Sequence, residues 1–211
     1  MPLPLPLAIA LRAAGRDLPG AWAMGALFLL ACAAFLRHNV LPPPIVQSAI
    51  RGAGILACTV ITASLAHGLA RRRPPWAWAR SLPASTRVRV GRAAALLAGG
   101  CLPALLAALG LEGAEPSGWG PVLLVLPWIA LRGAAALRAK RPDPAPLVAE
   151  GAFLAAWVAL VPWLSLVPVT LLPWALRVAV GAEKALSPHG WDERRHLPGA
   201  NPLAWDESGG G

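Results

Sequence analysis

Long stretches without a charged side chain constrain this chain more than any other feature. Residues 18–36, 52–70 and 93–111 each contain 19 consecutive residues without Asp, Glu, Lys or Arg. A fourth such stretch covers residues 116–131, and a fifth, of 26 residues, covers 151–176. A membrane-spanning helix needs about 20 apolar residues to cross ~30 Å of hydrocarbon, whereas a soluble amphipathic helix shows polar residues every third or fourth position. The stretches therefore predict an integral membrane protein built from helices.

The overall composition excludes the main alternatives. Apolar residues make up 56% of the chain and charged residues only 14%, against about 25% charged residues in an ordinary soluble domain. So few charges cannot cover a compact soluble monomer. The apolar content is also far too high for an intrinsically disordered chain.

The fifth stretch predicts two membrane segments. It contains Pro162, Pro168 and Pro173, and each proline removes a backbone hydrogen bond and clashes with the preceding helical turn. A tight hairpin of two helices fits better than one helix, and it is expected to be short or re-entrant because each leg barely spans a bilayer. The predicted fold class is all-α, a polytopic membrane protein with about six transmembrane helices. They are expected at about 18–36, 52–70, 93–111, 117–137, 146–163 and 166–183.

The chain divides into one membrane domain and a tail. Residues 1–183 are expected to form a single transmembrane domain, which opens with a short interfacial segment before the first span. Residues 184–207 are expected to be a cytoplasmic tail. The closing residues 208–211, Ser-Gly-Gly-Gly, resemble a cloning linker.

The distribution of Lys and Arg predicts the orientation of the six segments. With both termini in the cytoplasm, 17 of the 19 basic residues lie inside, and only Arg37 and Arg51 lie in an outside connection, residues 37–51. The same distribution explains the net charge of +9, so no nucleic-acid partner is expected. Membrane lipids are the expected partners of these basic residues.

The most informative connection is residues 71–92, RRRPPWAWARSLPASTRVRVGR. Three arginines and two prolines end the second span, and the tryptophans suit the membrane interface. The Ser-Leu-Pro-Ala-Ser-Thr run supplies hydroxyl caps and a proline for a new helix that begins near Ala84. This helix is expected to lie at the cytoplasmic membrane face and to lead into the third span. An ordinary basic loop with interfacial tryptophans is the alternative interpretation.

The run ARSLPASTRVRVGRAAALL resembles the intracellular loop of bacterial ABC transporter permeases of the type-2 exporter class. In that family, Leu-Pro followed by a small or hydroxyl residue and then basic residues marks the coupling helix between the second and third spans. The family's usual acidic residues upstream of the motif are replaced here by Arg71–Arg73. The coupling helix implied by the resemblance comprises Arg80, Ser81, Leu82, Pro83, Ala84, Ser85, Thr86, Arg87, Arg89 and Arg92.

The resemblance also implies the partners. The chain has no phosphate-binding G-x-x-x-x-G-K-[ST] motif, so ATP and Mg²⁺ would be bound by a separate cytoplasmic ATP-binding subunit, and this chain would bind no cofactor. A second permease subunit, identical or different, would complete the transporter. The implied location is the bacterial cytoplasmic (inner) membrane, with multiple spans.

Few polar side chains lie in the predicted spans. The candidate substrate path consists of Thr59, Thr62, Ser64 and His67, with helix–helix packing as the alternative role. No proton relay is expected, because no acidic residue was placed inside a span. The cysteines are expected to be small packing residues, namely Cys32, Cys58 and Cys101. No metal site is expected, since the spacing of the polar residues in the tail matches no ligand motif; these are His189, Asp192, Glu193 and His196.

Two functions from different classes follow. The first is the membrane-spanning permease subunit of an ATP-driven exporter, coupled to separate ATPase subunits through residues 71–92. The second is a non-transporting membrane scaffold or assembly subunit that binds anionic lipid and partner proteins. A membrane enzyme is a weaker third class, because no catalytic nucleophile or base is recognisable. The substrate stays open, with a preference for an apolar or amphipathic cargo.

Overall fold

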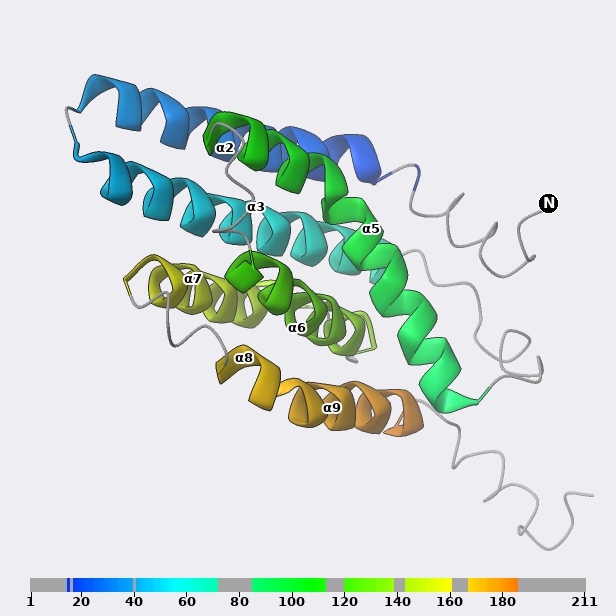
Figure 1. Ribbon diagram of the computed structural model, residues 1–211. Coiled ribbons are helices and arrows are strands. Elements are labelled where there is room, and N and C mark those ends of the chain that lie inside the picture. Colours follow the sequence, from blue (N-terminus) through cyan, green and yellow to red (C-terminus); the bar gives the residue numbers. More distant parts are fainter. Residues whose placement is uncertain are drawn as a thin grey trace, which may run out of the picture.

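The computed structural model describes residues 15, 17–39, 41–71, 85–112, 120–138, 143–160 and 167–185. In these ranges every regular element is a helix (Figure 1). The predicted all-α fold with about six segments is confirmed, because α8 and α9 are separated by a single residue and together form the sixth. The helices are α2 (Leu18–His38), α3 (Pro43–Arg71), α5 (Thr86–Glu112), α6 (Gly120–Ala136), α7 (Ala145–Leu160), α8 (Val167–Thr170) and α9 (Leu172–Ala185).

The helices fall into a long and a short set. The three long ones, α2, α3 and α5, are long and apolar enough to cross a membrane. The others contain 17, 16 and 14 residues in α6, α7 and α9. At 1.5 Å per residue, these helices reach only about 21 to 26 Å, less than the ~30 Å of a hydrocarbon core. The chain is therefore a helical membrane protein in which the α6 and α7 segments are short, whereas α8 and α9 together cover the 19 residues 167–185.

Helix α3 is the central helix of the bundle. It contacts α2, α5, α6 and α7, and Figure 1 shows α2 on one side of it, α6 and α7 on the other, and α5 crossing it obliquely. Its apolar stretch is 61% buried, whereas that of α2 is 17% buried. Ile55, Ile61 and Leu65 on α3 are each 1% exposed. Helix α2 is thus peripheral, with large apolar side chains such as Leu27 and Leu30 facing outward.

The connection between the first two helices is shorter than the predicted connection over residues 37–51. Helix α3 begins at Pro43, so the second half of that segment, including Arg51, is helical. Prolines are tolerated in the first turn of a helix, where the missing N–H would have no intrahelical partner. At the other side of the connection, the Asn39 side chain and backbone N–H both donate to the Phe35 carbonyl, which closes α2.

The last apolar stretch forms two helices, as its prolines indicate. Helix α7 ends at Leu160 and α8 begins at Val167. Pro168 and Pro173 each occupy the second position of a helix, α8 and α9 respectively, where proline costs no hydrogen bond. Pro162 lies outside the described residues. A single helix across 151–176 is therefore wrong, and the sixth segment returns along the bundle beside α6 (Figure 1).

Candidate functional site at the start of α5 and the end of α9

The part of the proposed coupling segment that the structure describes is the beginning of α5. The Ser85 hydroxyl accepts a hydrogen bond from the Val88 backbone N–H at 3.3 Å, as an N-cap serine does. Capping by Ser85 is thereby confirmed, and the helix begins one residue later at Thr86. Residues 86–92 are the first turns of one continuous helix that runs to Glu112, so they form no separate short helix. Residues 80–84 lie outside the described residues.

The arginines of this segment point in different directions. Arg87 and Arg92 are exposed, whereas Val90 is fully buried and Arg89 is half-buried. This alternation follows from the helical repeat of 3.6 residues, which turns positions 86, 89, 90 and 93 towards the bundle. The three arginines therefore have two roles, because only two of them are available to a partner outside the chain.

Arg89 is bound to an acidic side chain on the last helix. Its Nε donates to Oε1 of Glu183 on α9 at 2.8 Å. Arg138, just after the end of α6, donates through its own Nε to the other carboxylate oxygen of Glu183. The side chains of Glu183 and Arg138 are 1% and 3% exposed. We call Arg89, Arg138 and Glu183 the Glu183 cluster; it joins the ends of α5, α6 and α9.

Arg138 is the most extensively bonded member of this cluster. Besides Glu183, it donates to the Ala134 carbonyl of its own chain segment at 2.7 Å and to the Arg89 carbonyl of α5 at 3.3 Å. A buried charge is tolerated when it is paired and its remaining hydrogen-bonding groups are satisfied. One arginine therefore connects the backbone of α5 with the carboxylate of α9.

A second ion pair lies farther from this end of the bundle, measured along the helix axes. Arg132 on α6 binds Glu150 on α7 through both Nε, at 2.8 Å, and a terminal nitrogen. Its guanidinium lies 5.2 Å from the ring centre of Trp174 on α9 and 5.9 Å from that of Trp128, within the range of cation–π attraction. Arg132 precedes Arg138 by six residues, about 9 Å along the helix axis. The charges of the short helices thus lie at two levels, roughly one and a half turns apart.

Sequence reasoning missed both carboxylates. The expectation that no acidic residue lies inside a span is wrong, because the ranges predicted at 146–163 and 166–183 themselves contain Glu150 and Glu183, and both residues lie in the observed helices α7 and α9. The distribution of Lys and Arg identifies Arg138 only as one of the inside charges. The usable signal was an acidic residue within an otherwise basic helix end, since a buried acid there needs a cationic partner.

The threonines of the candidate substrate path lie in helix–helix contacts. Thr59 and Thr62 are fully buried. A Cβ added to Gly151 of α7 would lie 2.2 Å from Cγ2 of Thr59, and one added to Gly133 of α6 would lie 2.3 Å from Cγ2 of Thr62. Such glycines let helix backbones approach closely in membranes. Both threonine side chains are therefore held directly against the neighbouring backbones.

The hydroxyl groups of these threonines are also occupied. Thr59 donates to the Ile55 carbonyl of its own helix at 2.8 Å, and the Thr62 hydroxyl lies 3.3 Å from the Cys101 sulfur, which in turn donates to the Cys58 carbonyl. Ser64 and His67 are half-buried. His67 lines a cavity of about 10 Å³ near the start of α7. The substrate path stays a prediction.

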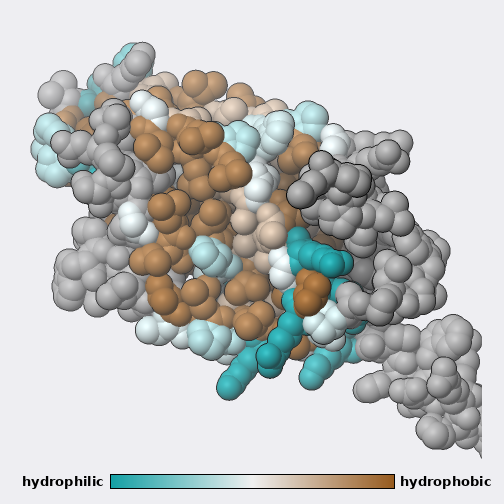
Figure 2. Space-filling model, turned by 45° about the vertical axis from the view of Figure 1, so that its right-hand side comes forward, coloured by the Kyte–Doolittle hydropathy of each residue, from teal (hydrophilic) through white to brown (hydrophobic). Residues whose placement is uncertain are grey.

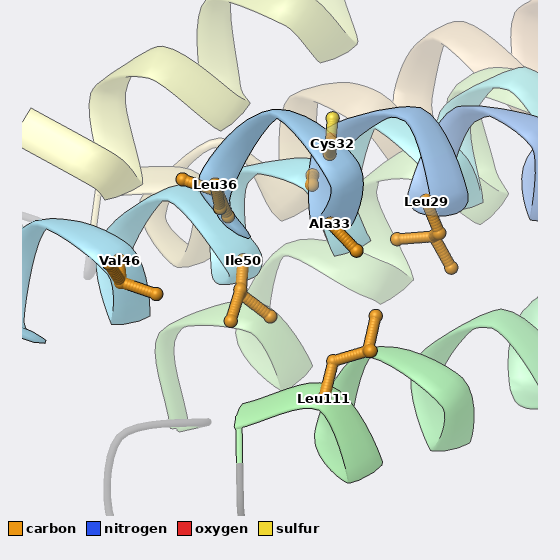
Figure 3. Close-up of a pocket in the computed structure, with 8 residues that line it drawn as sticks. Leu29, Cys32, Ala33, Leu36, Val46, Ile50 and Leu111 are labelled. Carbon is orange, nitrogen blue, oxygen red and sulfur yellow. The ribbon is translucent and has the colours of Figure 1, made fainter. Parts of the chain in front are cut away.

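A larger apolar cavity of about 150 Å³ lies at the opposite end of the long helices. Figure 3 shows Leu29 and Leu36 of α2, Ile50 of α3 and Leu111 of α5 around it. Its lining carries no charged residue. Among the described ranges, no group of three or more His, Cys, Asp or Glu side chains is arranged to hold a metal ion.

Comparisons with known proteins add no relative from which a role could be transferred. No protein-family profile, curated protein or solved structure matches the chain.

Proposed function

We propose that the chain is the membrane-spanning permease subunit of an ATP-driven ABC-type exporter, coupled to separate cytoplasmic ATPase subunits through residues 71–92. The support from sequence is the resemblance of the segment that ends at Arg92, together with the inside location predicted for it. On this proposal the cytoplasmic subunit binds ATP and Mg²⁺, and a second permease subunit completes the membrane part in the bacterial inner membrane.

One structural observation carries the proposal furthest. Arg89 lies between the exposed Arg87 and Arg92, and it is fixed to Glu183 at 2.8 Å. A movement of the exposed arginines would therefore be transmitted to α9 through the Arg89–Glu183 ion pair. It would reach the end of α6 through Arg138, which contacts both Glu183 and the Arg89 carbonyl. Coupling between distant sites requires such a connected element. The two exposed arginines are free to meet acidic groups of a partner, where charge complementarity favours association.

The test is a pull-down of the tagged full-length chain, with mass spectrometry of the stoichiometric partners. The expected result is an ATP-binding subunit that co-purifies with the wild-type chain and is lost or uncoupled in Arg87→Glu with Arg92→Glu. The matched control is Arg87→Lys with Arg92→Lys, which keeps both charges and should keep the partner. The amount of protein in the membrane fraction should be the same for all three chains.

The alternative of a scaffold that binds anionic lipid gives a different result in the same experiment. No ATP-binding subunit would co-purify, and the glutamate variant would change only contacts with the membrane surface. A co-purifying ATPase that keeps its affinity and coupled turnover in the glutamate variant would exclude the start of α5 as the coupling element.

A further inference from the structure

Helix α9 has two faces of opposite character. Its buried face consists of Ala175, Ala179 and Glu183, spaced four residues apart and packed towards α6 and α5. Arg177 and Lys184 are exposed, and the helical repeat places both on the side opposite the buried face. Helix α9 therefore presents two cations outward, away from the bundle.

The space between these two cations is open. Arg177 and Lys184 are seven residues, or about 10 Å, apart along the same side of the helix. Gly181 lies between them, and a Cβ added to it would meet no atom within 4 Å. Towards the middle of the bundle the same side of the helix becomes apolar, because Pro173 is exposed and Trp174 is 49% exposed. Figure 2 shows hydrophilic side chains gathered at one edge of an otherwise apolar face.

No carboxylate neutralises this pair of cations within the described part of the chain. Glu183 is the acidic residue of α9, and it is fully engaged with Arg89 and Arg138 on the other side of the helix. Arg177 precedes Glu183 by six residues, as Arg132 precedes Arg138, so Arg177 lies at the deeper of the two charge levels. A cation that faces the bilayer at this level is unfavourable unless an anion accompanies it.

We propose that the outward face of α9 binds the headgroup of an anionic phospholipid. The phosphate would lie between Arg177 and Lys184 over Gly181, and an acyl chain would run along Pro173 and Trp174, which precede Arg177 by four and three residues on the same side of the helix. Basic side chains next to an exposed tryptophan and an apolar strip are the expected features of a helix at the anionic membrane surface. The inference is independent of the exporter proposal, because it depends on the outward face of α9 and on neither residues 71–92 nor an ATPase subunit.

The experiment uses the full chain purified in neutral detergent, with phosphatidylglycerol and phosphatidylcholine as the lipid probes. Native mass spectrometry should show preferential retention of phosphatidylglycerol, and tryptophan fluorescence should show a larger increase in melting temperature with that lipid. In Arg177→Gln with Lys184→Gln, phosphatidylglycerol should bind roughly tenfold more weakly or worse. The matched control is Arg87→Gln with Arg92→Gln, which removes two exposed arginines from α5 and should keep the preference.

Several outcomes would overturn the inference. One is an unchanged preference for phosphatidylglycerol in the α9 variant, and another is a loss of that preference in the α5 control alone. Equal stabilisation by soluble glycerol phosphate would identify a site for a free anion instead of a lipid. If the α9 variant changes the oligomeric state and leaves lipid retention unaltered, the face is occupied by a second copy of the chain.

Discussion

The Arg89 Nε on α5 and the Glu183 Oε1 on α9 lie 2.8 Å apart, although 94 residues separate them in the chain. Glu183 accepts a second arginine, Arg138, on its other oxygen. One carboxylate is thus shared by two guanidinium groups from two different segments. The first turns of α5 are thereby fixed to the last turn of α9.

Removing this carboxylate should destabilise the protein strongly. Glu183→Gln leaves Arg89 and Arg138 near each other without a counter-charge, and Arg138 is 3% exposed. Breaking a buried ion pair by removing one partner costs about 3–5 kcal/mol. We expect the free energy of unfolding in detergent to fall by about 3 kcal/mol or more, measured by denaturant titration with tryptophan fluorescence.

The control for this experiment is Glu150→Gln. The side chains of Arg132 and Glu150 are 19% and 31% exposed, and Arg132 keeps its cation–π contacts with the Trp128 and Trp174 rings after the change, so the loss should be smaller. An unfolding free energy of the Glu183 variant equal to that of the wild-type chain would show that the cluster contributes nothing to stability.

Close contact between α7 and α3 gives a second prediction. A methyl group at Gly151 would lie 2.2 to 2.6 Å from three side-chain atoms of Thr59, and Thr59 is fully buried. Gly151→Ala must therefore push α7 away from α3, and overpacking of this kind costs about 1–3 kcal/mol. The expected result is a lower melting temperature of the purified protein.

Gly99→Ala on α5 is the matched control for that change. A Cβ at Gly99 would meet nothing within 4 Å, and replacing glycine by alanine inside a helix stabilises by about 0.5–1 kcal/mol. The two variants should therefore shift the melting temperature in opposite directions. Shifts of the same sign and size would mean that α3 and α7 are farther apart than described.

Most of the fold could be predicted from the sequence because the charge-free stretches are long. The helices overlap all six predicted ranges, and α2 and the described end of α3 agree with the first two within two residues. The main difference is the start of α3, which extends nine residues before Gly52. Charge patterning indicates where hydrocarbon begins, but the helix continues beyond that level, as α3 does through Arg51.

The site was less predictable, for a physical reason. Arg87, Arg89 and Arg92 are equivalent in sequence, and the distinction between them depends on which face of α5 meets α9. That choice is made by Glu183, a partner 94 residues away, so no local pattern reveals it. Likewise, the sequence of α3 alone makes Thr59 and Thr62 candidates for a substrate path. Their packing against Gly151 of α7 and Gly133 of α6 becomes visible only in the structure.

The orientation of the bundle gives a third prediction. Both Pro42 and Ser85 are exposed and lie at opposite ends of the helices, and the distribution of Lys and Arg predicts that Ser85 is cytoplasmic. In a chain without its three native cysteines, Pro42→Cys should react with a membrane-impermeant maleimide in intact cells. Ser85→Cys should react only after lysis. The inverse labelling pattern would contradict the predicted topology.

The second ion pair, Arg132 with Glu150, gives the last prediction. It concerns how much of the stabilisation by Arg132 comes from the pairing with Glu150 and how much from the contacts with the tryptophan rings. Arg132 interacts with Glu150 through two hydrogen bonds and with the Trp174 ring at 5.2 Å, so Arg132 of α6 is held by side chains of both α7 and α9. In a double-mutant cycle with Arg132→Gln and Glu150→Gln, the coupling free energy should be about 1 kcal/mol or more, as for side chains in direct contact. Arg132→Gln should cost more than Glu150→Gln, because it also removes the cation from the faces of Trp128 and Trp174. Unfolding free energies in detergent measure all four corners of the cycle. A coupling energy near zero would mean that the pair is solvated like a surface salt bridge, and that the three short helices are held together by apolar contacts and the Glu183 cluster.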